Sequence, residues 1–320
     1  MSWERLLGAL GGKLSGNVPY MALKADQPTG QKPMNLFDTE EQTEHYLTLQ
    51  AGEGKHWGLM TGTLAGIGGV FFGVFAIVLL FQGDIEWFFK FFAISLASFF
   101  VPFLWETLRP LPLPILFNRR TREIYFEQDG VLYHCPWDEV AAVAYEFRLV
   151  GPYTGAMRSA ALETLMHQFQ RPEREVLVSL GVPIGKSLEL QLCFWEYLRA
   201  YMNSGPWFDE HGNHSESDAF VKSQLAITSK LSEKLGEHWR ELRKRHKESG
   251  GRNYLQLSDV FQLFSGALFY PVGLIEEFTY KVAKRRSRAN WPQAVRERLD
   301  PNGPTQRLID LERNSGALEV

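Results

Sequence analysis

Residues 64–81 read LAGIGGVFFGVFAIVLLF, and the run from His56 to Gln82 that contains them has no Asp, Glu, Lys or Arg. An α-helix rises about 1.5 Å per residue, so some 20 residues cross the roughly 30 Å hydrocarbon layer of a bilayer. Because a core helix of a soluble protein is rarely uncharged over this length, the stretch predicts a membrane-spanning helix at about residues 59–82. Five glycines within residues 58–69 predict that another helix approaches it closely.

A second apolar stretch, residues 87–105, follows after a link of only four residues. Its one charged residue, Lys90, lies near its start, where a long side chain can reach the lipid headgroups. Since the link is long enough only for a tight turn, the two stretches predict a helical hairpin within residues 55–108. Tryptophan is enriched at membrane–water interfaces, and three tryptophans are expected to be membrane anchors: Trp57, Trp87 and Trp105.

The distribution of Lys and Arg predicts the orientation of the hairpin, because cytoplasmic ends carry an excess of these residues. The link has none, whereas five flank the other ends: Lys55, Arg109, Arg119, Arg120 and Arg122. We therefore expect both termini and the main domain in the cytoplasm, the hairpin in a bacterial inner membrane, and residues 1–54 as an N-terminal cytoplasmic segment. The two cysteines, Cys135 and Cys193, are too few for a disulfide framework and fit a reducing compartment.

The segment after the hairpin predicts a small α+β domain over residues 109–207. It starts with RPLPLP, which cannot be helical because each proline lacks an N–H donor and favours extended geometry in the preceding residue. Residues 151–170 are ambiguous, because residues 156–169 fit either a helix or irregular structure, and we expect an insertion there. Asp129-Gly130 predicts a two-residue hairpin turn. The runs that predict strands of an antiparallel sheet are 115–118, 123–126, 131–135, 140–147 and 175–180.

Residues 187–202 predict an apolar helix that packs on this sheet. Ser187 is a favourable N-cap residue, and Gly205-Pro206 ends the helix. A strand meander followed by one packing helix is typical of small α+β domains. Four large aromatic side chains are expected to form its core: Trp137, Trp195, Tyr197 and Tyr201. We expect the indole N–H of Trp137 to have a hydrogen-bond acceptor there.

Three segments of this region resemble a known family: ILFNRRTR at residues 115–122, CPWDEV at 135–140 and FWEYLRAYM at 194–202. Together with the two apolar stretches and the proline-rich exit, they resemble an uncharacterised family of proteobacterial inner-membrane proteins. The resemblance covers about residues 59–207. It implies a pleckstrin-homology-like (PH-like) cytoplasmic domain carried by a membrane hairpin, encoded near type VI secretion effectors and their immunity genes, and it implies no catalytic residue.

Residues 208–290 predict a helical region. A long charged helix is expected at residues 216–249, with one apolar face that either docks on the domain or binds a partner: Leu231, Leu235, Trp239 and Leu242. Residues 260–275 form a third apolar patch, interrupted by two glycines and a proline. This patch lies in the headgroup zone, is buried against the sheet, or is a re-entrant or third crossing, and the sequence leaves these alternatives open. A basic cluster follows it: Lys281, Lys284, Arg285, Arg286 and Arg288.

The remaining residues, 291–320, are expected to be a polar tail.

A content of 45% apolar and 22% charged residues excludes a disordered chain, and a net charge of −3 gives no basic surface for binding nucleic acid. Histidines and carboxylates gather in residues 209–214, but the Gly and Asn between His211 and His214 predict a loop without a metal. The sequence also lacks a Gly-x-Ser-x-Gly elbow, a phosphate-binding glycine loop and a dinucleotide fingerprint. No catalytic residue, metal or cofactor is therefore expected.

The leading hypothesis is a non-enzymatic inner-membrane protein, an immunity or accessory protein that binds a type VI secretion effector, a secreted toxin, through its cytoplasmic domain. The alternative is a lipid-sensing or scaffolding module with a PH-like domain. In that alternative, membrane lipid is contacted by basic residues at the exit of the hairpin and behind the third apolar patch: Arg109, Arg119, Arg120, Arg122, Lys281, Lys284, Arg285, Arg286 and Arg288. The sequence leaves the oligomeric state open.

Overall fold

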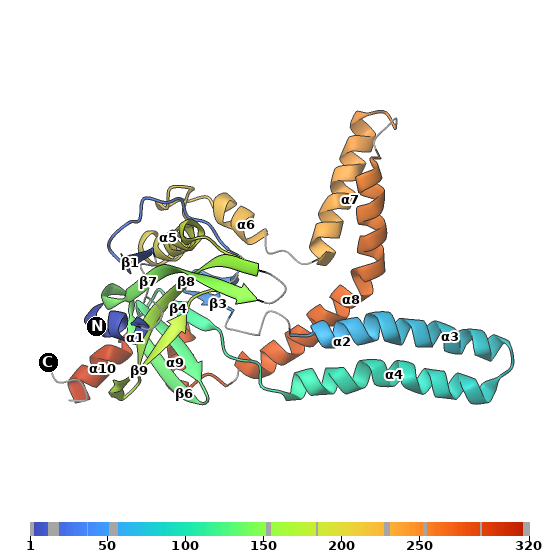
Figure 1. Ribbon diagram of the computed structural model, residues 1–320, viewed down its shortest axis with the longest axis horizontal. Coiled ribbons are helices and arrows are strands. Elements are labelled where there is room, and N and C mark those ends of the chain that lie inside the picture. The colour runs from blue at the N-terminus through green and yellow to red at the C-terminus, as the bar shows by residue number, and fades with distance from the viewer. Residues whose placement is uncertain are drawn as a thin grey trace. The chain divides into compact units, whose positions relative to one another are not determined.

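The computed structural model describes residues 3–11, 19–36, 38–50, 57–151, 155–183, 185–226, 231–251, 255–288 and 290–315. The chain forms two compact units (Figure 1). The first, here called the sheet domain, comprises residues 1–52, 112–228 and 291–320. The second, the helical unit, comprises residues 53–111 and 229–290. Each unit therefore combines segments that lie far apart in the sequence.

The sheet domain contains a nine-stranded antiparallel sheet among its described residues. Its strands run in the order β1-β7-β8-β6-β5-β4-β3-β2, and β9 also pairs with β8. At the β5–β6 hairpin, Asp129 and Gly130 have positive φ angles of 53° and 79°, as a two-residue type I′ turn requires. The strands are β1 Tyr20–Lys24, β2 Thr39–Gln42, β3 Tyr46–Leu49, β4 Ile115–Asn118, β5 Glu123–Gln128, β6 Val131–Pro136, β7 Ala141–Gly151, β8 Gly155–Gln168 and β9 Arg171–Ser179.

The expected order of elements, hairpin first and sheet second, is wrong, because the sheet begins before the hairpin. Strands β1, β2 and β3 come from the N-terminal segment, and β3 pairs with β4 across the whole intervening hairpin. Leu47 and Leu49 of β3 are fully buried in the core. The membrane hairpin is thus inserted between two strands of one sheet, and the boundary expected at residue 109 separates parts of a single domain.

The expectation for residues 151–170 is also wrong, because most of this stretch forms the long strand β8. Residues Ser159 to Leu162 are buried without alternation, since neighbouring elements cover both faces of the strand and other strands pair with both of its edges. A continuously buried run has no two-residue periodicity, so the sequence pattern does not separate this strand from a helix.

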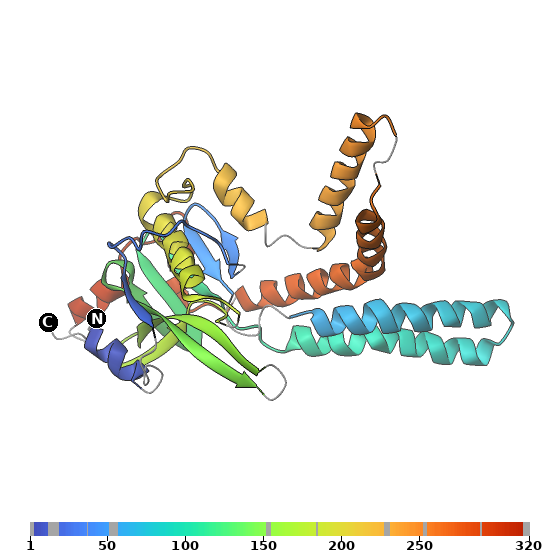
Figure 2. The ribbon, with the colours of Figure 1, turned by 45° about the horizontal axis from the view of Figure 1, so that its top comes forward.

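Helices cover both faces of the sheet (Figure 2). On one face lies α5, Leu188–Ser204, whose N-cap Ser187 accepts a hydrogen bond from the Leu190 amide. Its buried aromatic residues Trp195, Tyr197 and Tyr201 pack with Trp137 in the main core. On the opposite face, Leu6 and Leu10 of α1, Trp3–Leu10, bury against β7 and β8.

The segment expected to be a polar tail folds onto this opposite face as two helices, α9 (Gln293–Leu299) and α10 (Leu308–Ser315). Trp291, Val295 and Leu308 are at most 2% exposed and pack with Leu116 and Tyr125 of the sheet. The segment is mostly polar, but most of its described large apolar residues are buried against the sheet, and Leu311 is the exposed exception among them. The average polarity of residues 291–315 therefore does not indicate that part of this segment is buried.

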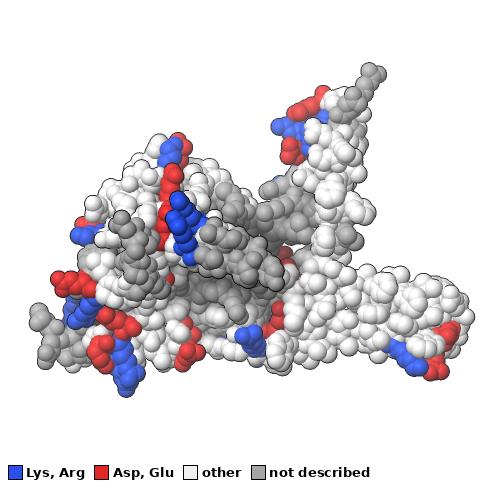
Figure 3. All heavy atoms as spheres, viewed as in Figure 1, with Lys and Arg blue, Asp and Glu red and all other residues white. Residues whose placement is uncertain are grey.

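The two apolar stretches form an antiparallel helical hairpin in the helical unit, as predicted. Helix α2 (Leu59–Thr63), a π-helical turn (Leu64–Gly69) and α3 (Val70–Phe81) make the first continuous span, and α4 (Ile85–Leu108) makes the second. Both are long and apolar enough to cross a membrane, and only 17% and 6% of their most apolar windows are buried. On the face shown in Figure 3, the hairpin is almost free of charged residues except at its tip. Asp84, Glu86 and Lys90 lie there, at the start of α4.

The glycines of the first span form two stripes with different neighbours. Gly69 and Gly73 face Ser95 of α4, and the hydroxyl of Ser95 donates a hydrogen bond to the Gly69 carbonyl. Gly58, Gly62 and Gly66 instead lie directly against the backbone of α8, Leu257–Arg288. Close approach of other helices is therefore the role of these glycines, as the sequence predicts.

The expected long charged helix is divided between the two units. Helix α6, Ala219–Ala226, belongs to the sheet domain, α7, Leu231–Glu248, belongs to the helical unit, and residues 227–230 are outside the described residues. On the expected apolar face of α7, Leu242 is buried and Trp239 is 53% exposed. A bidentate ion pair from Arg245 to Asp259 joins α7 to α8.

The third apolar patch is part of α8, and the second half of this helix packs against the hairpin. Val272 and Thr279 are buried, and the Phe278 ring stacks on Phe103 of α4. The Arg286 guanidinium donates a hydrogen bond to the Thr107 carbonyl at the carboxyl end of α4. This contact with the hairpin was not among the three alternatives, although length and composition allow bent α8 to be a third span.

Candidate functional site

Four polar side chains form a row across one face of the sheet. Glu123 and Tyr125 are two residues apart on β5 and so point to the same face. Tyr125 is paired with His134 of β6, and His134 is paired with His167 of β8. Cys135, which follows His134, lies in the core on the opposite face, so the two side chains point apart as the sequence predicts. The sheet register therefore brings two histidines and a carboxylate together.

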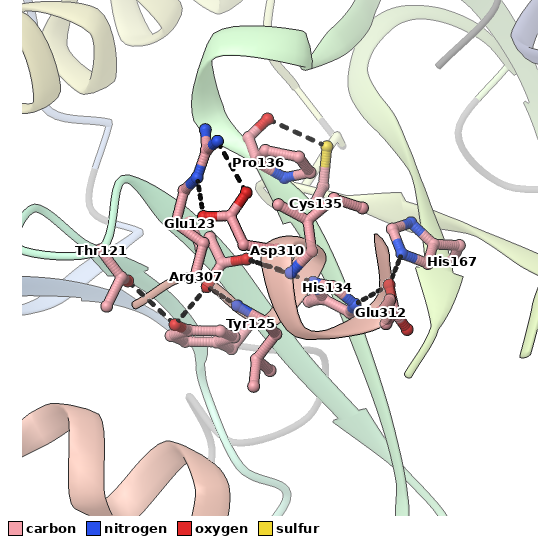
Figure 4. Close-up of polar contacts among 12 residues, drawn as sticks. Thr121, Glu123, Tyr125, His134, Cys135, Pro136, His167, Arg307, Asp310 and Glu312 are labelled. Carbon is pink, nitrogen blue, oxygen red and sulfur yellow. Dashed lines mark hydrogen bonds and ion pairs between the residues drawn. The ribbon is translucent and has the colours of Figure 1, made fainter. Parts of the chain in front are cut away.

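Helix α10 adds a second carboxylate to this row (Figure 4). The Glu312 Oε2 atom lies 3.2 Å from His134 Nε2 and 3.0 Å from His167 Nε2. The other oxygen, Oε1, accepts a hydrogen bond of 2.6 Å from the Gln170 amide, next to the end of β8. The side chains of His134, His167 and Glu312 are only 0%, 6% and 1% exposed. We call Glu123, His134, His167 and Glu312 the histidine–carboxylate cluster.

Glu123 holds the amino terminus of α10 against the sheet. Its two carboxylate oxygens accept hydrogen bonds of 2.9 and 3.1 Å from the backbone N–H groups of Leu308 and Ile309. The Tyr125 hydroxyl donates to the same carboxylate at 2.8 Å. First-turn N–H groups of a helix have no intrahelical partner and carry partial positive charge, so a buried carboxylate satisfies both requirements.

Burial and mutual contacts shift the pKa values of three groups of the cluster. Burial raises the pKa of Glu312, but hydrogen bonds from His134 and His167 and the charge of His134 outweigh this and lower it to about 2. Burial likewise raises the pKa of Glu123, yet His134 and the α10 amides lower it below its usual value. For His134, burial lowers the pKa, and its two carboxylate neighbours more than offset this and raise it. The two carboxylates beside His134 therefore favour the protonated form of its imidazole.

This arrangement can bind a cation or fasten α10, and it is poorly suited to nucleophilic chemistry. Each of the three convergent residues offers one ligand atom, from His134, His167 and Glu312, and these atoms lie within 4.8 Å of one another. Burial raises the pKa of the neighbouring Cys135 thiol to about 12, so this cysteine is not a reactive thiolate.

Ion pairs surround the buried cluster at the more exposed edge of α10. Arg307, directly before the helix, pairs with Asp310 in its first turn at 2.9 Å, and Arg313 reaches Glu139 at 2.7 Å. These groups are about one third exposed or more, so each pair contributes little compared with the buried contacts.

The exit arginines proposed as lipid ligands make hydrogen bonds inside the sheet domain. Arg119 donates to the Glu44 carbonyl at 2.9 Å and lies over the Tyr201 ring. Arg120 donates to the carbonyls of Asp300 and Gly303. Arg122 pairs with Asp138 at 2.6 Å and also donates to the Met202 carbonyl.

The remaining lipid candidates lie in the helical unit. Arg109 lies over the ring of Trp57, and Arg286 donates to the carboxyl end of α4. Lys281 is 58% exposed and pairs with Glu277, Lys284 is partly buried and Arg285 is exposed. The side chain of Arg288 and the residue Lys55 lie outside the described parts of the chain.

The three expected membrane anchors differ in their surroundings. Trp87 and Trp105 are 49% and 65% exposed on the hairpin surface. Trp57 is buried, and its indole N–H donates to the Glu106 carbonyl at 2.8 Å. The Glu106 carboxylate in turn accepts hydrogen bonds from the amides of Gly58 and Thr61, so the end of α4 caps the start of α2.

The expected core aromatic residues are all buried. The indole N–H of Trp137 donates to Asn203 Oδ1 at 2.8 Å, and its ring packs on Trp195. Tyr197 and Tyr201 donate to Gln42 Oε1 and to the Thr43 carbonyl, which ties α5 to the segment preceding the hairpin. Residues 209–214 form a turn in which Asp209 Oδ1 accepts hydrogen bonds from the backbone amides of His211 and Asn213.

Sequence reasoning missed the histidine–carboxylate cluster because two of its residues lay in segments with wrong expectations. His167 is on β8, which was expected to be an insertion, and Glu312 is on α10, which was expected to be a tail. The detectable signal was the alternation that places Glu123 and Tyr125 on one face of a strand, opposite His134 in the next strand. Comparison of the chain with models of protein families, with curated proteins and with solved structures found no match.

Proposed function

We propose that this chain is a non-enzymatic, integral protein of a bacterial inner membrane that presents its sheet domain to a protein partner in the cytoplasm. One observation carries the membrane part of the proposal, namely the exposed apolar surface of the hairpin. Phe71, Phe81 and Val101 are 64%, 87% and 66% exposed, and many other large apolar side chains of the two helices are more than 40% exposed. A soluble protein rarely leaves such a continuous apolar surface in water, whereas lipid covers it without cost.

The charges at the two ends of the hairpin support the proposed orientation. The tip carries Asp84, Glu86 and Lys90, and Lys90 is already paired with Glu86 at 2.6 Å. The other end carries Arg109 and Arg286. This asymmetry favours a periplasmic tip and cytoplasmic ends.

Cysteine labelling tests both parts of this placement. We expect the protein to sediment with membranes, to resist alkaline extraction and to require detergent for release. A cysteine replacing the exposed Gln82 at the tip should react with a membrane-impermeant maleimide in intact spheroplasts. A matched cysteine replacing the exposed Glu173 on β9 should react only after lysis. Labelling of the Glu173→Cys variant in intact spheroplasts, or recovery of soluble protein, would reject the placement.

For the partner, we propose a type VI secretion effector, with this chain as its immunity or accessory protein. The resemblance of residues 115–122, 135–140 and 194–202 to hairpin-anchored, PH-like proteins supports this role. The first two segments include parts of β4 and β6, and the third is part of α5, the helix that covers one face of the sheet. Occluding a toxin needs about 800 Å² of complementary surface on each partner, which a domain of this size can supply.

Co-expression with the neighbouring effector tests this role. Growth should stop when the effector is expressed alone and resume when this chain is expressed with it, in a strain that lacks both genes. Equal toxicity with and without the chain would reject the immunity role.

The lipid-sensing alternative depends on the basic residues of α8, so a Lys281→Glu/Arg285→Glu variant distinguishes lipid sensing from protein binding. Protection that survives this charge reversal supports protein binding, and joint loss of protection and of binding to anionic vesicles supports lipid sensing.

A further inference from the structure

Two histidines and one glutamate converge within the sheet domain. The Nε2 atoms of both rings point at the same oxygen, Oε2 of Glu312, at 3.2 and 3.0 Å. Adjacent donors around a tetrahedral zinc ion lie about 3.3 Å apart, because each ligand atom is about 2.0–2.1 Å from the metal. The two spacings to Glu312 Oε2 are close to that value, and all three ligand atoms lie within 4.8 Å of one another. Imidazole nitrogen and carboxylate oxygen are both common zinc ligands.

The surroundings of these three residues resemble the outer shell of a metal site. A ligating histidine usually donates its second ring N–H to a carboxylate, which fixes the orientation of the ring. His134 Nδ1 lies 3.5 Å from Glu123 Oε1, has no hydrogen-bond partner in the structure and belongs to a side chain that is fully buried. Glu123 is itself held by the α10 amides, and Glu312 is oriented by the Gln170 amide.

Charge balance points in the same direction. Glu123 and Glu312 bring two carboxylates into a space where both are at most 1% exposed. Buried carboxylates are tolerated when they are paired or coordinate a metal, and a divalent ion balances both charges at once. The neighbouring ring of His167 is 4.2 Å from that of His134, so both imidazoles can approach one ion.

We propose that His134, His167 and Glu312 bind a divalent transition-metal ion of the zinc type, with Glu123 orienting His134 from the outer shell. The three donors come from β6, β8 and α10, so the ion joins the last helix of the sheet domain to the face of the sheet. Three protein donors leave the fourth vertex of the tetrahedron to a small ligand such as water. Because the ligand side chains are at most 6% exposed, the protein shields the bound ion from bulk solvent.

Metal analysis of the full-length protein in detergent tests the proposal. The protein is stripped with a chelator, reloaded with zinc chloride, desalted and analysed by elemental mass spectrometry. We expect about one zinc ion per chain, and less than about a tenth of that in the Glu312→Gln and His167→Gln variants. The matched control is His211→Gln, which removes a histidine that is 60% exposed and outside the cluster, and it should keep the full zinc content.

The outer shell makes a separate quantitative prediction within the same experiment. Glu123→Gln keeps an oxygen that can accept hydrogen bonds from the α10 amides, but it removes the carboxylate charge beside His134. It should lower the zinc affinity about 10- to 100-fold without changing the number of sites.

The wild-type protein alone also decides the question if the variants do not fold. Stripped wild-type protein loaded with cobalt should give the intense visible absorption of a four-coordinate ion, and zinc should displace it. Folded wild-type protein that takes up no zinc, a cobalt spectrum equal to that of the free ion, or full zinc content in both the Glu312→Gln and His167→Gln variants would overturn the proposal.

Discussion

Replacing Glu123 by Ala should lower the free energy of unfolding of the sheet domain by about 3–5 kcal/mol, the usual cost of removing one partner from a buried charged pair. The change leaves the N–H groups of Leu308 and Ile309 without their acceptor, and the Tyr125 hydroxyl without its carboxylate partner. It also removes one of the two carboxylates that enclose His134.

Hydrogen exchange locates this loss as well as measuring it. In chelator-treated protein, which excludes any contribution from bound metal, amides of residues 308–315 should exchange much faster in Glu123→Ala than in the wild type. Thermal unfolding monitored by tryptophan fluorescence should shift in the same direction, because Trp137 and Trp195 lie in the core of this domain.

Glu139→Ala is the matched control for this prediction. Glu139 also connects the sheet domain to α10, through Arg313, but both side chains are about 40% exposed. An exposed ion pair is worth about 0–1 kcal/mol, so this variant should unfold close to the wild type. If the two variants lost equal stability, Glu123 would not be the residue that holds α10 on the sheet.

The sequence predicts the hairpin and most strands because each has a local signal. An uncharged run of more than 20 residues has few structures available to it, and alternation between turn residues specifies β4, β5 and β6. The order of the sheet has no such signal. β3 pairs with β4 across the inserted hairpin, and nothing in the segment from Thr39 to Leu49 shows which distant strand it joins.

The candidate site follows the same rule. Glu123, Tyr125 and His134 lie on neighbouring strands that the sequence does predict, so part of the row could be derived from strand register. His167 depends on the pairing of β6 with β8, and Glu312 depends on the docking of α10 on the sheet. Both are long-range contacts, and the buried face of α10 consists of few residues, among them Leu308, Ile309 and Glu312. From the sequence alone, a charged residue on a short polar helix is expected to be exposed to solvent, because the buried groups that it contacts are not yet known.

Gly62→Val should separate α8 from the hairpin, and this second large effect tests the close helix packing. A Cβ atom at Gly62 would lie 2.7 Å from the Val272 carbonyl oxygen and 3.1 Å from Glu276 Cβ. A backbone carbonyl cannot rotate aside as a side chain can, so α8 must move. Overpacking of this kind costs about 1–3 kcal/mol, which changes the docked-to-undocked ratio about 5- to 150-fold.

Cross-linking measures this separation directly, because the rings of Phe103 and Phe278 are stacked 5.7 Å apart between α4 and α8. Cysteines at these two positions, in a chain whose buried Cys135 and Cys193 are replaced by Ala, should cross-link rapidly in the wild-type background and slowly with Gly62→Val. Gly68→Val is the matched control, because it also replaces a glycine of the first span by valine. A Cβ atom at Gly68 would have the Ser98 hydroxyl as its nearest neighbour, at an ordinary contact distance of 3.8 Å. Equal cross-linking in the two variants would show that α8 does not lie on Gly62, because both variants replace a glycine of the same span by valine and only Gly62 lies against the α8 backbone.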